Sequence, residues 1–210
     1  QQQKKTICFV SQYREFMLNC SNNIYNNYHN TMVLIYKASV NWANDRKYKI
    51  IVAMCNTEND SEYESELNFF RSLGKNSNVF LEAKKDKEIK LSSYKLAIES
   101  DLTVGMDSSL MMEVFGIKQK VLWGVSAQQG LMSQLGIEMY KEKLPSEVML
   151  KNLTQSGFNK SMDTLLQMTD EQYSSLTKNA RKYFMNIKAP YPHKIISRDI
   201  EAFITASYQR

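Results

Sequence analysis

The chain has 210 residues, of which 43% are hydrophobic and 23% charged, and its formal net charge is +5. These values are typical of a globular protein with a sizeable core, and they exclude a disordered low-complexity chain. Because Lys and Arg are interspersed with Asp and Glu along the chain, the charge pattern does not predict a nucleic-acid-binding protein.

The cysteines and the hydropathy give an expectation about the compartment. Cys8, Cys20 and Cys55 are odd in number, and two of them fall in predicted buried strands, where a thiol behaves as a small apolar group. No apolar run approaches the roughly 20 residues that span a bilayer, and the first residues do not resemble a signal peptide. We therefore expect a cytoplasmic protein, or one that lies peripherally at the inner face of the membrane.

The first part of the chain predicts a strand, a helix and a second strand. Residues 6–10 and 49–55 are uninterrupted apolar runs, as expected for strands that are covered on both faces. Between them, residues 31–46 carry apolar side chains at spacings near three and four, and Asn30 precedes them as a possible cap. This arrangement is one β-α-β unit.

The same alternation continues toward residue 124. A helix with an acidic start is expected to end at Gly74, and shorter strands and helices then alternate. The expected elements are helix 58–73, strand 79–83, helix 92–99, strand 102–104, helix 109–115 and strand 120–124. Alternation at this pitch predicts an α/β fold, with a doubly wound and mostly parallel sheet of the Rossmann-like kind.

The rhythm changes after residue 124. The sequence predicts a short helix over 128–135, an edge strand or extended segment over 144–148, two helices within 160–187 that separate near 169–170, and a final amphipathic helix over 193–208. There is no internal repeat and no convincing linker. Residues 1–210 are therefore expected to form a single domain.

The turn Asp107-Ser108-Ser109 is the strongest candidate site. It joins an apolar strand to the start of a helix, so small hydroxyls and unpaired backbone N–H groups meet at the carboxyl end of a strand. Open α/β sheets bind phosphate groups at such positions, where the helix dipole favours negative charge. The alternative is that Asp107 or Ser108 only caps the helix.

Residues 94–123 also resemble a known family of domains. The features are Ser100-Asp101 before a strand, the Ser108-Ser109 turn, an early helical Glu113, then Gly116 and the strand that ends at Trp123. This order resembles the carboxy-terminal, donor-binding domain of GT-B glycosyltransferases, in particular those that build bacterial surface polysaccharides. It is more distantly similar to UDP-N-acetylglucosamine 2-epimerases of the same fold. The resemblance is specific over about thirty residues and only topological elsewhere.

The resemblance implies roles for further residues. In such enzymes an early helical glutamate binds the ribose hydroxyls of the nucleotide, which implies that role for Glu113. The loop after the first strand faces the cleft between the two domains, which makes Ser11, Gln12 and Arg14 candidates for contacts with the donor. Glu113 could instead be an exposed helix residue, and the loop residues could be ordinary loop caps. Asn56-Thr57 follows the second strand in the same way, although Thr57 could simply cap the next helix.

Other chemistries find no support in the sequence. Neither a phosphate-binding loop ending in Gly-Lys-Ser/Thr nor a Gly-x-Gly-x-x-Gly after the first strand is present, and Gly-x-Ser-x-Gly is also absent. His29 and His193 are the only histidines, and no Cys or His spacing is typical of a metal site. No cofactor and no metal are therefore expected. Trp123 could border a base or sugar, although an interior tryptophan usually serves packing.

The leading functional hypothesis is the nucleotide-sugar-binding part of a glycosyltransferase for surface polysaccharides. The partners it implies are a nucleotide-sugar donor, a glycan or lipid-linked acceptor, and an amino-terminal domain that would normally supply the catalytic base. An isolated donor domain would bind its donor without turnover. Two alternatives remain open: a sugar-nucleotide epimerase or hydrolase on the same fold, and a non-catalytic binding module.

Overall fold

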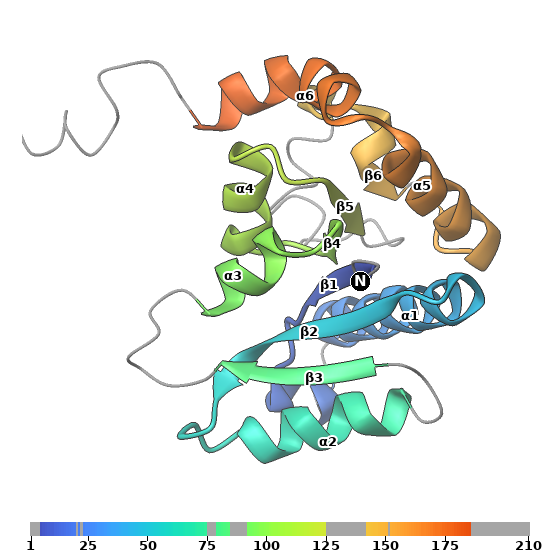
Figure 1. Ribbon diagram of the computed structural model, residues 1–210. Coiled ribbons are helices and arrows are strands. Elements are labelled where there is room, and N and C mark those ends of the chain that lie inside the picture. Colours follow the sequence, from blue (N-terminus) through green and yellow to red (C-terminus); the bar gives the residue numbers. More distant parts are fainter. Residues whose placement is uncertain are drawn as a thin grey trace, which may run out of the picture.

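The computed structural model describes residues 5–19, 21, 23–74, 79–84, 92–124, 142–150 and 152–185. The architecture is a six-stranded sheet in the order β3-β2-β1-β4-β5-β6, in which every neighbouring pair is parallel (Figure 1). The strands are β1 (Thr6–Val10), β2 (Lys49–Thr57), β3 (Val79–Lys84), β4 (Leu102–Gly105), β5 (Val121–Gly124) and β6 (Met149–Leu150). The predicted α/β fold with a parallel sheet is confirmed.

Helices cover both faces of this sheet. The helical segments are η1 (Glu15–Asn19), α1 (Asn23–Arg46), α2 (Tyr63–Leu73), α3 (Ser92–Ile98), α4 (Ser109–Gly116), η4 (Ser146–Val148), α5 (Gln155–Gln167) and α6 (Asp170–Met185). On one face, Phe9 of β1 packs against Tyr36 of α1 and Phe70 of α2, with ring centroids 5.0 and 6.0 Å apart. The other face holds α4 and α6, where the Phe115 ring lies 4.9 Å from the Trp123 ring.

The central strands form because their residues are apolar in sequence and lie between these two layers. All four residues of β4 and all four of β5 are buried, as are four of the five in β1. Continuous apolar runs without alternation are expected for parallel strands that are covered on both faces. Cys8, fully buried in β1, packs as part of this core as predicted.

Two helix starts differ from the prediction. Helix α1 begins at Asn23, so Asn30 lies inside the helix and does not cap it. Helix α2 begins at Tyr63 and not at residue 58, because residues 58–62 form a turn. The Asp60 carboxylate accepts hydrogen bonds from the Thr57 N–H at 2.6 Å and from its hydroxyl at 2.8 Å, so Thr57 belongs to this turn and does not cap α2.

The carboxy-terminal part of the described chain agrees more closely. Two helices separate at residues 168–169 as predicted, although the first begins at Gln155, where the Thr154 hydroxyl caps it by accepting from the Gly157 N–H. The extended segment expected over 144–148 is instead a short 3-10 helix, and the edge strand follows it at β6. The helices predicted over 128–135 and 193–208 lie outside the described residues.

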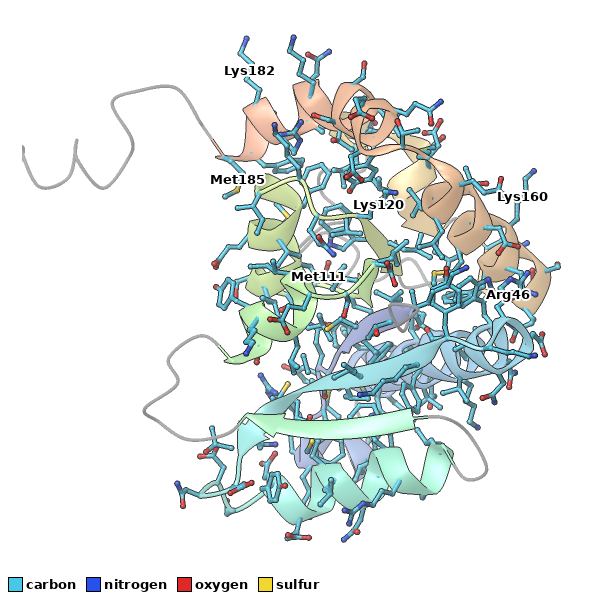
Figure 2. All side chains as sticks on the ribbon, viewed as in Figure 1. Arg46, Met111, Lys120, Lys160, Lys182 and Met185 are labelled. Carbon is cyan, nitrogen blue, oxygen red and sulfur yellow. The ribbon has the colours of Figure 1, made fainter. Side chains whose placement is uncertain are left out.

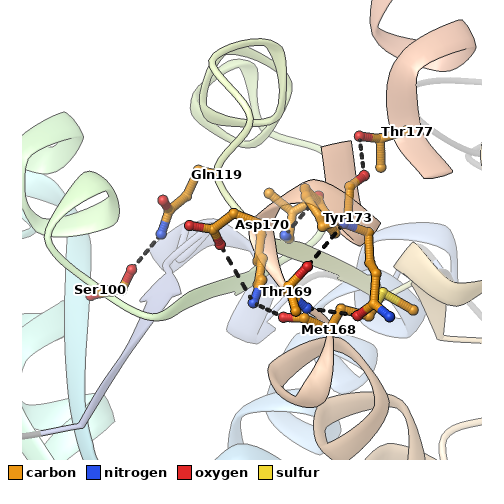
Figure 3. Close-up of polar contacts among 10 residues, drawn as sticks. Ser100, Gln119, Met168, Thr169, Asp170, Tyr173 and Thr177 are labelled. Carbon is orange, nitrogen blue, oxygen red and sulfur yellow. Dashed lines mark hydrogen bonds and ion pairs between the residues drawn. The ribbon is translucent and has the colours of Figure 1, made fainter. Parts of the chain in front are cut away.

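Polar contacts fasten these last helices to the rest of the fold. At the junction of α5 and α6, Lys120 Nζ donates to the Met168 carbonyl at 2.6 Å and lies 3.8 Å from the Asp170 carboxylate (Figure 3). In the second half of α5, Asp163 pairs with Arg46 at 2.6 Å and joins α5 to α1 (Figure 2). Within the described ranges, no helix is both long and apolar enough to cross a bilayer.

Candidate functional site at the carboxyl edge of strands β1 and β4

Strands β1 and β4 are neighbours in the sheet, but the chain leaves them in opposite directions. After β1 it runs through α1 to β2 on one side, and after β4 it runs through α4 to β5 on the other. The loops that follow these two strands therefore diverge at the point where the strand order reverses. Open α/β sheets bind their ligands at this position, outside the carboxyl ends of the strands.

Gln12 joins the two loops across this point. Its side-chain amide nitrogen donates a hydrogen bond to the Asp107 carbonyl in the turn after β4, and its side-chain oxygen accepts one from the Tyr28 hydroxyl of α1. The side chain is half-buried. Gln12 thus couples residues 95 positions apart in the chain and fixes the relative position of the two loops.

Arg14, Tyr28 and Asp107 share one electrostatic environment around Gln12. Burial raises the pKa of Tyr28, the Asp107 and Cys55 charges raise it further, and the Arg14 charge opposes this rise. For Arg14 itself, partial burial lowers the pKa, but a hydrogen bond to Cys55 and nearby carboxylates outweigh it, so its pKa is raised. Arg14 is exposed and keeps its positive charge, so this edge of the sheet carries a cation that solvent can reach.

Helix α4 begins beside this cluster. Ser108 occupies the position before the helix in an extended conformation, with φ −134° and ψ 139°, and its side chain makes no capping hydrogen bond. The alternative in which the Ser108 hydroxyl caps the helix is therefore not observed. Ser109, the first helical residue, is exposed. The N–H groups of the first helical turn have no partner within a helix, which leaves donors available for an anion.

Close packing at Gly105 sets how α4 approaches the sheet. A Cβ atom at this last residue of β4 would lie 3.0 Å from the Met111 sulfur and 3.1 Å from the Val10 Cβ. Met111 is fully buried, as are Val114 and Phe115, which confirms that the apolar flank of Glu113 belongs to the core. The absence of a side chain at Gly105 allows α4 to begin directly above the ends of β1 and β4.

Glu113 lies one turn beyond Ser109 and is half-buried. Its carboxylate oxygen Oε2 accepts a hydrogen bond from the Tyr94 hydroxyl of α3. Burial, followed by the hydrogen bond and the charge of Glu113, raises the pKa of Tyr94 to about 12, so the phenol is protonated and donates. Glu113 is therefore not the simple exposed helix residue of the alternative interpretation.

Ser11 has a different role from the one the sequence suggested. It is only 3% exposed, and its hydroxyl donates to the Glu66 carboxylate at 2.5 Å while accepting the Tyr13 N–H at 3.1 Å. Because the hydroxyl is already used inside the protein, Ser11 does not offer it to a ligand. We therefore correct this part of the expectation: Ser11 holds the loop, and Gln12 and Arg14 follow it toward the edge.

Glu66 is a residue that the sequence analysis missed. It is fully buried on α2, and its carboxylate accepts the Ser11 hydroxyl, the backbone N–H groups of Cys55 and Asn56 at 2.9 Å each, and the Asn56 side-chain amide at 2.9 Å. It ties α2 to the ends of β1 and β2. The available signal was its place beside Leu67 and four residues before Phe70, on the apolar side of an amphipathic helix.

Two further candidates, Trp123 and His29, are both buried. Trp123 is fully buried against Phe115, so it serves packing and does not border a ligand. Burial lowers the pKa of His29, whose ring lies 5.2 Å from the Phe69 ring between α1 and α2. No group of three metal-binding side chains occurs in the part of the chain that the structure describes.

Comparisons with protein-family models, with curated proteins and with solved structures find no match to this chain. The fold is Rossmann-like. The structure brings Gln12, Arg14 and Asp107 together at one edge of the sheet and places the Ser108-Ser109 helix start and Glu113 on α4. It turns Ser11 inward, away from this set.

Proposed function

We propose that this chain binds a nucleotide-sugar and is the donor-binding domain of a GT-B glycosyltransferase for surface polysaccharides. The observation that carries the proposal is the junction at the carboxyl edge. Gln12 joins the loop after β1 to the turn after β4, beside the start of α4. A site of this form suits an anionic nucleotide group.

Different groups at this edge bind different parts of the nucleotide-sugar donor. The first-turn N–H groups of α4 and the Arg14 guanidinium supply donors and positive charge for the diphosphate. Glu113 is one turn further along α4 and suits the ribose, because a carboxylate accepts hydrogen bonds from two neighbouring hydroxyls. This division follows the resemblance of residues 94–123 to the GT-B donor domain.

The proposed reaction is transfer of the sugar to a glycan or lipid-linked acceptor. The acceptor hydroxyl forms a bond to the anomeric carbon, the bond from that carbon to the diphosphate breaks, and the hydroxyl proton passes to a base. Developing negative charge on the departing diphosphate is stabilised by donors that are already in position, which is a mainly electrostatic contribution. We assign the base to a second domain, and a sugar-nucleotide donor places the reaction in the cytoplasm or at the inner membrane face.

A thermal-shift screen tests the binding step. UDP, GDP, CMP, dTDP and their sugar conjugates are each added to the protein, because a ligand that binds only the folded state raises the melting temperature. We expect at least one of them to stabilise the wild type. In Ser109→Asp the added carboxylate repels the phosphate, so the shift is lost, while an acidic residue in the first helical turn does not destabilise the fold.

The control variant is Ser156→Asp. Ser156 is exposed in the first turn of α5, so it receives the same substitution at a helix start outside the proposed site. It should keep the full ligand-induced shift. A shift that persists in Ser109→Asp contradicts the assigned site, and no shift with any nucleotide contradicts the proposed function. Release of free sugar or of an epimer from the donor alone would favour the hydrolase or epimerase alternative.

A further inference from the structure

Lysines gather where the carboxyl ends of α4 and α6 meet, at the opposite end of α4 from the candidate site. At Gly116, the last residue of α4, a Cβ would lie 2.7 Å from side-chain atoms of Met185 at the end of α6, so the two helix ends are in contact. Lys143 comes from a third segment, and its Nζ lies 5.8 Å from the centroid of the Tyr183 ring. Lys182 points outward beside Met185 (Figure 2). The exposed lysines at this junction, called the basic surface below, are Lys118, Lys143, Lys178 and Lys182.

The lysines of the basic surface have no counter-charge among the described residues. Within these ranges every salt bridge is made by other cations, and Glu142 does not pair with its neighbour Lys143. Arg181 of the same helix is only 4% exposed, and its guanidinium donates to Thr177 and to Ser174 without an acidic partner in the described chain. Positive charge at this junction is therefore not neutralised by the part of the protein that the structure describes.

The helix dipole explains only part of this arrangement. It favours cations in the last turn of α6, where Lys182 lies, and anions in the first turn, where Asp170 and Glu171 lie. Lys118 and Lys143 belong to other segments, namely the turn after α4 and the segment before η4. Their convergence on the same helix end concentrates positive charge on one surface, and such a surface attracts anionic partners.

Two exposed apolar side chains lie among these lysines. Ile117 precedes Lys118, Tyr183 follows Lys182, and each of the two apolar residues is 57% exposed. This combination suits an anionic lipid bilayer, because the lysines meet the headgroup phosphates while the apolar side chains enter the interface. Nucleic-acid sites favour arginine and aromatic rings that stack on bases, whereas the exposed cations here are all lysines and Ile117 has no ring.

We propose that the basic surface is a docking site for a bilayer of anionic phospholipid. The lysines contact the phosphates, and Ile117 and Tyr183 lie in the interface between them. The eight residues of α4 separate this surface from Ser109 by about 12 Å, so a docked bilayer leaves the candidate nucleotide site open. The inference does not rest on the proposed function, and either can fail without the other.

Co-sedimentation with large unilamellar vesicles tests this docking site. Vesicles of phosphatidylcholine alone are compared with vesicles of an equimolar mixture of phosphatidylcholine and phosphatidylglycerol, at low salt and at about 0.5 M NaCl. We expect the wild type to bind only the anionic vesicles, and to be released from them at the higher salt concentration, because salt screens its lysines.

The first variant is Lys178→Gln combined with Lys182→Gln, both on α6. It should bind the anionic vesicles about tenfold more weakly or worse, since each lysine near an anionic surface contributes several-fold to binding. The matched control is Lys47→Gln combined with Lys160→Gln. It removes the same charge from exposed lysines after α1 and on α5, and Lys160 lies away from Lys182 (Figure 2). The control should bind like the wild type.

The second variant, Ile117→Ser combined with Tyr183→Ser, keeps every lysine. It should also bind the anionic vesicles more weakly, because less apolar area enters the interface. Absence of wild-type binding, an equal loss in the control, or unchanged binding in either surface variant overturns the inference. Binding of a labelled single-stranded RNA in place of vesicles, lost in the lysine variant, would assign the surface to nucleic acid and also overturn it. Nucleotide-induced thermal shifts should be unchanged in all variants, so the proposed function is tested separately.

Discussion

A single buried carboxylate organises the loops from which the candidate site is built. Glu66 lies fully inside the protein and satisfies two backbone N–H groups where the pairing of β2 with β3 becomes irregular, between Ala53 and Thr57. Hydrogen bonds to a charged acceptor are stronger than neutral ones, and a buried N–H without a partner costs stability. The position of the loop after β1 therefore depends on α2, although α2 contributes nothing to the proposed ligand contacts.

Replacing Glu66 with Gln should destabilise the protein by about 2–4 kcal/mol, the range expected when a buried hydrogen-bonded charge is removed. The glutamine amide nitrogen is a donor, so wherever it lies it faces at least one of the donors from Cys55 or Asn56. The control is Glu64→Gln, since Glu64 is exposed on the same helix. Urea titration of the wild type and of both variants measures the free energy of unfolding.

In this comparison Glu64→Gln should change the free energy of unfolding by less than about 0.5 kcal/mol, as surface substitutions usually do. Equal stability of the two variants would show that the buried carboxylate does not hold the loops. The sequence alone did not reveal this role, because Glu66 lies among other acidic residues, Glu62 and Glu64, at the start of α2. Only the contacts from β1 and β2 distinguish it from them.

At the scale of elements, local sequence predicted strands better than helix starts. Strands β1 and β4 could be predicted because continuous apolar residues are typical of strands that are covered on both faces of a parallel sheet. Helix α1 was predicted too short because its first turns contain several asparagines, which have low intrinsic helix propensity. Burial of Tyr28 and His29 compensates for that propensity, and such tertiary packing is not visible in a short window of sequence.

The approach of α4 to the sheet gives the prediction at this scale. Gly105→Ala would place a Cβ 3.0 Å from the Met111 sulfur and 3.1 Å from the Val10 Cβ, so these neighbours must each give way by a few tenths of an ångström. Overpacking of this kind typically costs about 1–3 kcal/mol. We expect a matching loss in the free energy of unfolding, measured by urea titration.

Gly116→Ala is the matched control for this substitution. At the last residue of α4 a Cβ would lie 2.7 Å from the Cγ and Cε of Met185 and 2.9 Å from its sulfur. All three atoms belong to one flexible side chain, which can take another rotamer, and alanine favours the helix over glycine (Figure 2). Its stability should therefore stay close to that of the wild type. If Gly105→Ala were as stable as Gly116→Ala, the close packing of α4 on the strand ends would not be a constraint on the site.

For the whole molecule, the alternation of strands and helices predicted the fold class but not the assembly of the site. The alternation of strands and helices implies parallel strands, but it does not show that β4 pairs with β1. In the structure this pairing places Ile7 opposite Leu102. The bond from Gln12 to Asp107 depends on that long-range pairing. The inward direction of Ser11 depends on a third element, α2, so the sequence alone does not show which side chains of the loop after β1 face the edge of the sheet.

Hydrogen exchange read out by mass spectrometry shows whether the edge between β1 and β4 binds the anionic part of a nucleotide. Exchange of backbone amides is compared with and without the nucleotide that gives the largest thermal shift. We expect slower exchange in peptides that cover residues 10–14 and 107–113, and unchanged exchange in peptides from α5 and α6. Protection confined to other segments, with none at these two loops, would contradict it.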